Sequence, residues 1–444
     1  MYGKAVISSA IIASLVAMLF YLAVALAIAP IIQATYNDPG VVYAPSHFQD
    51  ARQYVYICIQ GYDFPENPAY TFGPESRLSW MPIFPLLQCG LHHIARVSLL
   101  YAGTFISLIS AGVTVFTATL ILYDLSRKYA ALHALVILVP VIGSAWFYLP
   151  SVEATFLAIG MIVLWYIVRP LPEAPTKMLF RNLGGGVLGV IFILTKPNAL
   201  AMLIPLGFAF LFNSWHYSRR RGYEFGLWVF AADLLIEGFK PLLKRKRELY
   251  QRFYVTEHRE ILLDFTPLWV SAGILLGFSF WLAYASSLSG VPFFSLRLQM
   301  ENWRPAWPSG NFGEMLFYFS QAFRGIDGTK PWRYVAAWYL AAYLSSIVPA
   351  ASPRVPGLIR GMLVGMALFL PLTGAVRGTD RHVLSTALVA IGWACWVAPK
   401  GKINFSYFLR WAFVIILAVT TSYVLLWHMI PLGQPKPYDL ALFD

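Results

Sequence analysis

Long apolar runs recur from one end of this chain to the other, and they limit its possible folds more than any other feature. Runs of about eighteen or more apolar residues suit membrane-spanning helices, and a water-soluble core does not need them. The composition agrees, because 58% of the 444 residues are hydrophobic and only 12% are charged. The short alternating strands typical of a membrane barrel are not seen in the sequence. We therefore predict an all-α polytopic membrane protein with one membrane-embedded domain, residues 1–444.

About eleven membrane spans follow from the hydropathy pattern. The predicted spans are residues 6–32, 99–122, 130–149, 154–168, 184–194, 198–212, 268–286, 335–347, 357–372, 383–397 and 407–430. Two of them are short, and we interpret them as separate helices that turn at Thr195-Lys196-Pro197. Pro197 lacks a backbone donor and disfavours helical geometry at Lys196, which suits a turn. The first span is expected to be a retained helix and not a cleaved signal.

Basic residues gather in the short loops on one side of this scheme. They are Arg127, Lys128, Arg169, Lys177, Arg181, Arg354, Lys400 and Lys402. Because cytoplasmic loops are enriched in Lys and Arg, we expect the N-terminus inside and the C-terminus outside. The net charge of +12 is then explained by topology and not by nucleic-acid binding.

The same scheme predicts three long connections. Two large outer loops, about residues 33–98 and 287–334, are expected to lie against the membrane as short interfacial helices. The cytoplasmic stretch at about 214–264 mixes basic and apolar residues, which is typical of an interfacial helix on anionic lipid.

The first outer loop carries the residue of greatest chemical interest, Asp50. A carboxylate close to lipid is costly to hold there, so it is a candidate for chemistry at the membrane surface. Helical periodicity would place Asp50, Tyr54 and Ile57 on one face, with Gly61 ending that helix. A proline-rich stretch at 81–87 is then expected to break the chain before the second span. The alternative is an interfacial aspartate that only caps a helix.

The cysteines and histidines show no metal-site spacing. Cys58 and Cys89 both fall in the first outer loop, and their spacing leaves their pairing open. The chain lacks D-x-D and H-E-x-x-H patterns, so we expect neither a catalytic metal nor a cofactor.

Residues 48–62 read FQDARQYVYICIQGY. This stretch resembles the W-D-A-x-x-F/Y-x-x-I-A-x-x-G-Y motif of the PIG-V family, whose eukaryotic members are GPI mannosyltransferase II. That family belongs to the GT-C membrane glycosyltransferases, which use lipid-phosphate sugars. The aspartate, the alanine and the terminal Gly-Tyr match, whereas Gln49 stands in place of the tryptophan.

Three further stretches are similar to motifs of that family, in the same order. MPIFPLL at 81–87 is similar to F-F-P-L-F-P-L-L, and PSVEATF at 150–156 is similar to Y-S-E-S-L-F. LTKPNA at 194–199 is similar to L-T-R-P-T-G, with lysine for arginine.

Two later stretches extend the resemblance over most of the chain. GVPFF at 290–294, followed by Gln299 and Trp303-Arg304, is similar to G-D-P-L-A-F…Q…W-G-R. The aspartate of that motif is missing here, and the spacing from glutamine to tryptophan is longer. Arg381-His382 is similar to a late R-Y/H pair that precedes the final spans.

The resemblance implies a GT-C-type bundle and an inverting glycosyl transfer at the outer face. A single displacement with inversion needs one base, and the resemblance implies Asp50 for that role. Cations would hold the leaving phosphate. The implied phosphate-binding residues are Lys196, Arg381 and Arg304, and the implied acceptor- or sugar-binding residues are Glu153, Tyr54, Gln299 and Trp303.

Several of these residues also have structural explanations. Lys196 would snorkel from a helix end, and Arg381 would pair with Asp380 or Glu153. Glu153 would complement the dipole at the start of the fourth span, and Trp303 would belong to an aromatic belt.

The implied partners are a polyprenyl phosphate sugar, with mannose first among the sugars, a glycan, lipid or protein acceptor, and membrane lipids. The sequence favours a bacterial or archaeal cell membrane with the site on the outer face, or the lumenal face of the ER membrane in a eukaryote. Two alternatives remain, a lipid or sugar transporter and a scaffold subunit with a decayed site. A transporter is expected to carry mid-span ionisable residues and internal repeats, which we do not find in the sequence.

Overall fold

The structure, a computed structural model, describes residues 2–36, 49–62, 77–125, 129–135, 151–169, 175–220, 264–303, 345–373, 383–398, 405, 407–413 and 415–416. Within these ranges the chain is helical and forms no strand. The helices are α1 (Lys4–Tyr36), α2 (Gln49–Gln60), η3 (Arg77–Ser79), α3 (Ile83–Ala95), α4 (Leu99–Asp124), α5 (Ala130–His133), α7 (Val152–Val168), α8 (Pro175–Ile193), η6 (Pro197–Met202), α9 (Leu203–Arg220), α12 (Thr266–Ser289), α13 (Phe294–Trp303), α16 (Ile347–Ala351), α17 (Gly357–Thr373) and α18 (Val383–Val397). The all-α prediction is confirmed for this part of the chain.

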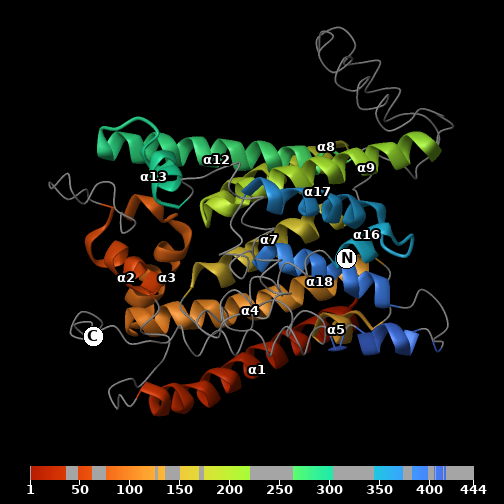
Figure 1. Ribbon diagram of the computed structural model, residues 1–444, viewed down its shortest axis with the longest axis horizontal. Coiled ribbons are helices and arrows are strands. Elements are labelled where there is room, and N and C mark those ends of the chain that lie inside the picture. Colours follow the sequence, from red (N-terminus) through yellow and green to blue (C-terminus); the bar gives the residue numbers. More distant parts are fainter. Residues whose placement is uncertain are drawn as a thin grey trace, which may run out of the picture.

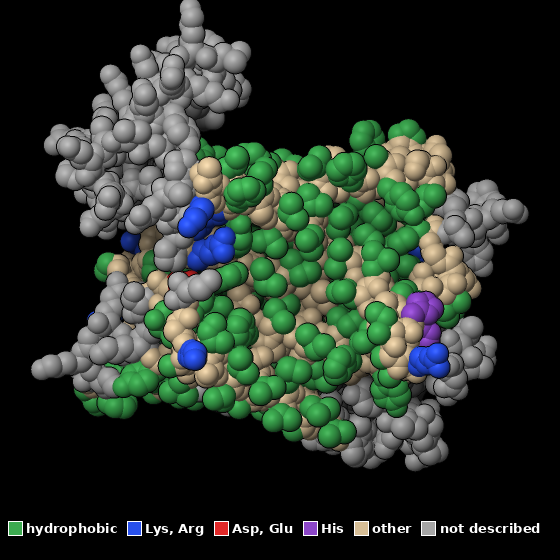
Figure 2. Space-filling model, turned by 180° about the vertical axis from the view of Figure 1, so that it is seen from behind, with side chains coloured by type: hydrophobic (Ala, Val, Ile, Leu, Met, Phe, Trp, Pro, Cys, Tyr) green, Lys and Arg blue, Asp and Glu red, His purple; other side chains and the backbone are tan. Residues whose placement is uncertain are grey.

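Four helices in the described ranges are long and apolar enough to cross a membrane, namely α1, α4, α8 and α12. α1, α4 and α12 have 33, 26 and 24 residues, and about 20 residues are needed to cross the hydrocarbon core. Figure 2 shows hydrophobic side chains over the middle of one face of the molecule, with Lys, Arg and His toward its two ends. These features indicate an integral membrane protein, and the predicted number of about eleven spans is not confirmed.

The long helices pack side by side in one body (Figure 1). α1 packs on α4, α4 packs on α7, and α7 packs on both α8 and α18. α8 packs on α12, and α9 packs on α17. The main core contains buried residues from α1, α4, α7, α8, α9, α12, α17 and α18, so these helices share one apolar interior.

The turn predicted at Thr195-Lys196-Pro197 is confirmed. α8 ends at Ile193, and Lys196 has an extended backbone with φ −158°. The beginning of α8 contacts the beginning of α12 through Arg181 and Thr266, and Phe210, in the middle of α9, contacts Phe265 there as well. α8 and α9 are therefore antiparallel, because α8 runs away from the start of α12 and α9 returns toward it after the turn.

The start of α8 corrects the predicted boundary. The prediction placed Lys177 and Arg181 in a loop and began the helix at residue 184, whereas α8 begins at Pro175 and has 19 residues. Arg181 is 2% exposed, because α7 and α12 surround it. A short predicted span is thus a helix long enough to cross a membrane.

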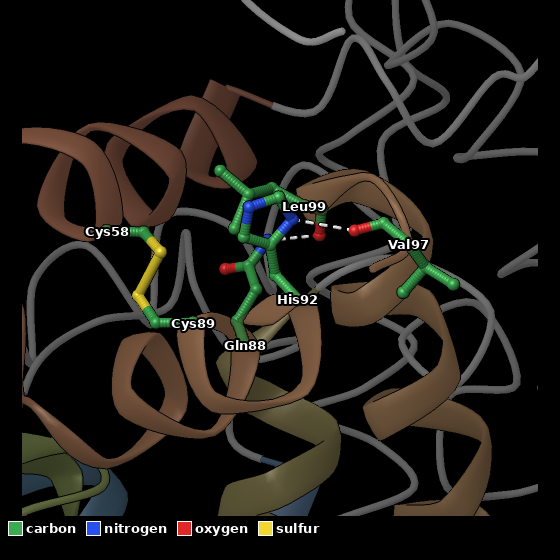
Figure 3. Close-up of a disulfide and its surroundings, with 6 residues drawn as sticks. All are labelled: Cys58, Gln88, Cys89, His92, Val97 and Leu99. Atoms are coloured by element: carbon green, nitrogen blue, oxygen red, sulfur yellow. Dashed lines mark hydrogen bonds between the residues drawn. A yellow bond between two sulfur atoms is a disulfide. The ribbon is translucent and has the colours of Figure 1, made fainter. Parts of the chain in front are cut away.

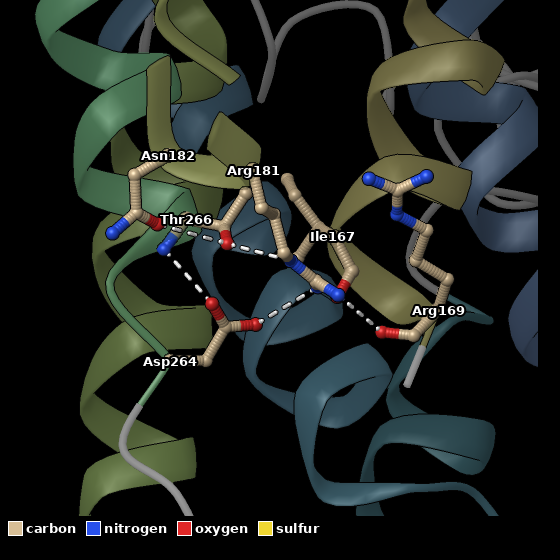
Figure 4. A network of polar contacts seen from close by, with 6 residues as sticks. All are labelled: Ile167, Arg169, Arg181, Asn182, Asp264 and Thr266. Atoms are coloured by element: carbon tan, nitrogen blue, oxygen red, sulfur yellow. Dashed lines mark hydrogen bonds and ion pairs between the residues drawn. The ribbon is translucent and has the colours of Figure 1, made fainter. Parts of the chain in front are cut away.

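Arg181 joins three helices through a buried polar network (Figure 4). Its guanidinium donates to the carbonyls of Ile167 and Arg169 at 3.0 and 2.9 Å and to the Thr266 hydroxyl at 3.0 Å. It also pairs with Asp264 at 3.4 Å. The network compensates a buried charge and fixes the ends of α7, α8 and α12 relative to one another.

Glycines allow α8 and α12 to approach at the backbone. A Cβ on Gly189 would lie 2.2 Å from the carbonyl oxygen of Val270, and one on Gly273 would lie 2.0 Å from that of Gly186. Small residues at such spacings are typical of membrane helices that pack backbone to backbone. This contact sets the position of α8, whose last residue leads into the turn at Lys196.

Other predictions lie partly or wholly outside the described residues. Of the predicted span at 130–149, the described part contains α5 and extends only to residue 135. The predicted span at 335–347 is described only from residue 345, and α16 begins at Ile347 after a turn. The stretch 221–263 and the loop 304–344 lie outside the described residues.

Candidate functional site

The bundle has two ends. We call the end where α2, α3 and α13 lie the motif end, on the left in Figure 1. The opposite end carries the Arg181 network and is called the basic end. Arg169, which the sequence scheme placed in a cytoplasmic loop, lies at the basic end beside Arg181, whereas Lys196 lies at the motif end with the turn that follows α8.

The predicted helix that carries Asp50 is α2, and Asp50 lies in its first turn. Gly61, with φ 72°, follows its last residue, as predicted. Tyr54 and Ile57 are both buried, which confirms the predicted face for these two residues. Asp50 lies one helical turn before Tyr54, and its side chain lies outside the part that the structure describes.

Tyr54 attaches α2 to α3. Its ring contacts the rings of Phe84 and Trp80 at centroid distances of 4.7 and 5.3 Å. These residues form a small apolar cluster with Val152, at the start of α7. Tyr54 is 1% exposed, so its ring packs within the framework that holds α2 beside the start of α7.

The proline-rich stretch at 81–87 begins a helix, which corrects the predicted break. Pro82 is the N-cap of the 13-residue helix α3, and Pro85 lies in its first turn. Proline is tolerated there, because amides in a first helical turn have no intrahelical acceptor. The amide of Ile83 donates instead to the carbonyl of Leu194 at 3.2 Å, so α3 starts directly beside the turn that carries Lys196.

Lys196 and Glu153 form an ion pair at this point. The Lys196 ammonium donates to Glu153 Oε1 at 2.7 Å. The Lys196 side chain is 13% exposed and that of Glu153 is 1% exposed. Glu153 lies in the first turn of α7, so it complements both the helix dipole and the ammonium. The structural explanation of Glu153 therefore holds, and Lys196 is paired with it in this structure.

The second outer loop meets the first at the motif end. Gly290, with φ 67°, ends α12, and α13 follows. The Ser295 hydroxyl donates to the carbonyl of Leu78 at 3.1 Å and accepts from Trp281 Nε1 at 3.2 Å. This bridge joins α12, α13 and η3. α13 contains Gln299 and Trp303, and it is thereby fixed against the loop that follows α2.

Tyr62, directly after α2, packs against the same region. Its ring lies 5.3 Å from that of Trp281, and its hydroxyl donates to the carbonyl of Trp80 at 3.1 Å. Burial, and then the nearby Tyr284, raise the pKa of the Tyr62 phenol. The phenol is therefore protonated at neutral pH and remains a donor.

The cysteine pairing that the sequence left open is resolved in the structure. Cys58 of α2 and Cys89 of α3 form a disulfide with a Cα–Cα distance of 5.4 Å (Figure 3), within the range that a disulfide spans. Sequence reasoning missed the Ser295 bridge and the Ile83–Leu194 hydrogen bond. Neither has a sequence signal, because a serine hydroxyl and backbone groups occur everywhere in a chain.

Besides Asp50, four predicted site residues lack described side chains. The backbone of Gln299 and Trp303 lies in α13, and nothing of their side chains is described. Arg304 and Arg381 lie outside the described residues, so the predicted pairing of Arg381 does too. The structure therefore brings together the positions of Glu153, Lys196 and Tyr54 with the helices that carry Asp50 and Gln299. Within the described ranges, no group of three His, Cys, Asp or Glu side chains lies close enough to hold a metal ion.

No protein-family profile and no curated protein matches the chain. Two solved structures of an oligosaccharyltransferase from Archaeoglobus fulgidus are similar to it. One holds an inhibitory peptide and a dolichol-phosphate, with 14% identity, a TM-score of 0.42, and coverage of 87% of this chain. The other is tethered to an acceptor peptide, with 13% identity, a TM-score of 0.42, and coverage of 88%. This chain spans about half of each of them, 52%, and the likeness is too distant to support an argument about function.

Proposed function

We propose that this protein is a GT-C-type, inverting glycosyltransferase of the PIG-V-like kind. It moves a hexose, mannose first among the candidates, from a polyprenyl phosphate to an acceptor at the outer membrane face. One observation carries the proposal: five sequence stretches that resemble motifs of one family, separated by up to two hundred residues or more in the chain, meet at one end of the bundle. They are the α2 stretch, the start of α3, the start of α7, the turn after α8 and the turn between α12 and α13.

The proposed chemistry is a single displacement at the anomeric carbon. The Asp50 carboxylate takes the proton of the acceptor hydroxyl as its oxygen forms a bond to that carbon. The bond from the anomeric carbon to the phosphate oxygen breaks, and the polyprenyl phosphate leaves with the electron pair. Since attack and departure occur on opposite faces, the configuration inverts.

Lys196 is proposed to bind the donor phosphate. Its ammonium is tethered by Glu153 at the end of a turn that is fixed by Pro197 and by the Ile83–Leu194 hydrogen bond. A pre-oriented cation stabilises negative charge on a leaving group with little reorganisation. Arg381 and Arg304 are proposed to complete the phosphate site.

Glu153, Gln299 and Trp303 are proposed to contact the acceptor or the sugar. Glu153 would use its second carboxylate oxygen, Oε2, while Oε1 accepts from Lys196. Tyr54 is buried under α2, so we assign it to positioning that helix beneath the acceptor and not to direct sugar contact.

The disulfide supports the proposed side of the membrane. Disulfides persist in oxidising compartments and are rare in the cytosol. Cys58 and Cys89 lie at the motif end, which the loop charges had independently predicted to face outward. The site is therefore proposed to open to the periplasm or cell exterior, or to the ER lumen in a eukaryote.

The transporter alternative is less well supported, because a transporter typically carries internal repeats and we find none in the sequence. A scaffold with a decayed site remains the main competitor, and an activity assay separates the two.

The first test is a donor panel with the protein in lipid nanodiscs. Polyprenyl phosphate mannose, glucose and galactose are offered with a short glycan acceptor, and the product is identified by mass spectrometry. Lys196→Met is expected to raise the donor KM by about tenfold or more, and Lys196→Arg to retain most of the donor binding. Lys177→Met is the matched control, because Lys177 is an exposed lysine on α8, the helix that precedes the turn of Lys196. If no donor of the panel is used, the transferase proposal fails. Donor movement across a vesicle membrane without transfer would favour the transporter.

A further inference from the structure

The helix that carries Asp50 is short and lies outside the membrane-crossing body. α2 has 12 residues, and isolated helices of that length are marginal in water. Its outer side is exposed at Ile59. Its noncovalent attachments in the described part include the Tyr54 ring, the buried side chains of Val55 and Ile57, and the contacts at its C-terminal end, where Arg77 donates to Gln60 and, at 3.4 Å, to the carbonyl of Gly61.

The disulfide attaches α2 to an element that is itself fixed. Cys58 lies eight positions after Asp50, and Cys89 lies in the middle of α3. Beside Cys89, the buried Gln88 donates to the carbonyl of Leu99 at 2.7 Å, at the start of α4. His92 Nδ1 lies 2.7 Å from the carbonyl of Val97 (Figure 3). α3 is thus held on the body, and the disulfide passes that restraint to α2.

We propose that the Cys58–Cys89 disulfide is the positioning element of the Asp50 helix, so that the site is assembled only when this pair is oxidised. The proposal rests on the proposed function for its catalytic half. Forming the bond removes two electrons and two protons from the two thiols. A dithiol–disulfide oxidase at the outer face accepts them by thiol–disulfide exchange through a mixed disulfide.

Two features separate this role from general stabilisation. The bond closes a loop with a sequence separation of 31, and that loop contains the last residues of α2, all of η3 and the first half of α3, but none of the long helices of the body. The body is held by its own packing, which includes the α8–α12 contact and the Arg181 network. Reduction is therefore expected to loosen α2 and to leave α4, α7, α8 and α12 unchanged, as local opening of a weakly held unit does.

The test compares amide hydrogen exchange in nanodiscs for the full chain. The samples are the oxidised protein, the same protein after reduction, Cys58→Ser, and Cys395→Ala. Cys395 is buried in α18 and outside the disulfide, so its variant is the matched control. Amides of α2 are expected to exchange about tenfold faster or more in the reduced protein and in Cys58→Ser. Exchange in α4 and α7 is expected to stay the same, as is all exchange in Cys395→Ala.

The second readout is transfer. Reduction is expected to lower kcat severalfold with the donor KM little changed, because Lys196 belongs to the body and Asp50 to α2. Reoxidation is expected to restore kcat in the wild type and not in Cys58→Ser. If the bond only stabilises the fold, reduction would instead lower the unfolding temperature and leave kcat unchanged.

The two readouts keep the proposals apart. Equal α2 exchange in the oxidised and reduced protein, or recovery of unlinked Cys58 and Cys89 peptides from protein made in an oxidising compartment, would overturn the positioning role. Faster α2 exchange without transfer by the oxidised protein would retain the positioning of α2 and overturn the transferase.

Discussion

The Lys196–Glu153 pair makes a sharp energetic prediction, because its two partners differ in exposure. At 2.7 Å the gross Coulomb attraction is about 6 kcal/mol for an effective dielectric constant near 20, and desolvation offsets much of it. Lys196→Met leaves a carboxylate that is 1% exposed without its cation, so we expect a loss of about 3 kcal/mol in unfolding free energy. Glu153→Gln is expected to cost about 2 kcal/mol, because the lysine, at 13% exposure, has a path to water.

The double variant separates the pair from its surroundings. Lys196→Met/Glu153→Gln leaves no uncompensated charge, so its expected cost is about 2 kcal/mol and the coupling energy about 3 kcal/mol. Unfolding free energies are measured in mixed detergent micelles for the four members of the cycle. Lys177→Met is the control and is expected to change stability by less than about 0.5 kcal/mol. A coupling energy near zero would show that the two charges do not interact in the folded protein.

Three further predictions use the same unfolding measurement. Gly273→Ala is expected to cost about 3 kcal/mol in unfolding free energy, because its Cβ would lie 2.0 Å from the carbonyl oxygen of Gly186. Gly207→Ala is the control and should be neutral or slightly stabilising, because a Cβ there would meet no atom within 4 Å. Equal effects of the two variants would exclude backbone contact between α8 and α12. Arg181→Lys is expected to cost about 3 kcal/mol in unfolding free energy, because an ammonium cannot donate to two carbonyls, a hydroxyl and a carboxylate at once. A loss below about 1 kcal/mol would mean that these hydrogen bonds do not hold the three helices together. Burial and then the hydrogen bond to the Asp124 carboxylate raise the pKa of Tyr2 from 10.0 to about 12. The stabilising effect of Tyr2 is therefore complete below pH 10 and is lost as the pH rises through about 12. Tyr2→Phe should be less stable than the wild type at about pH 8 and should lack this alkaline decline, and parallel pH profiles of the two proteins would contradict the prediction.

The pattern of apolar runs predicted the long helices well. The predicted spans at 6–32, 99–122, 268–286 and 383–397 correspond to α1, α4, α12 and α18. Hydropathy succeeds here because each helix must satisfy its own backbone in lipid and carry apolar side chains over its whole length. The turn at Pro197 was predictable for an equally local reason, the missing donor of proline.

The errors share a physical cause, which is compensation by distant residues. Arg181 looked like a loop residue because an isolated arginine is costly in a helix within the membrane, but two carbonyls, Thr266 and Asp264 compensate it. The partners come from helices far away in the chain, so no local window contains them. The proline-rich stretch at 81–87 was misjudged similarly, because Ile83 donates to Leu194, more than a hundred positions away.

The candidate site was predictable as a set of positions and not as a set of contacts. The sequence motifs pointed to Glu153 and Lys196 separately, as a helix-start acid and a turn cation. Their ion pair depends on how α7 and α8 pack, which the glycine contact with α12 and the Arg181 network determine. The pairing of Cys58 with Cys89 likewise depends on α2 lying against α3.

The most direct test of the central claim is single-turnover transfer from a polyprenyl phosphate sugar by the wild type and by Asp50→Asn. If Asp50 is the base, Asp50→Asn is expected to lower the transfer rate by about a hundredfold or more, which is the range for loss of a general base, with donor affinity and the Cys58–Cys89 bond intact. Asp63→Asn, the same change in the same outer loop, is the control and should transfer like the wild type. Equal rates for the wild type and Asp50→Asn would show that Asp50 is not the base and that the base lies elsewhere.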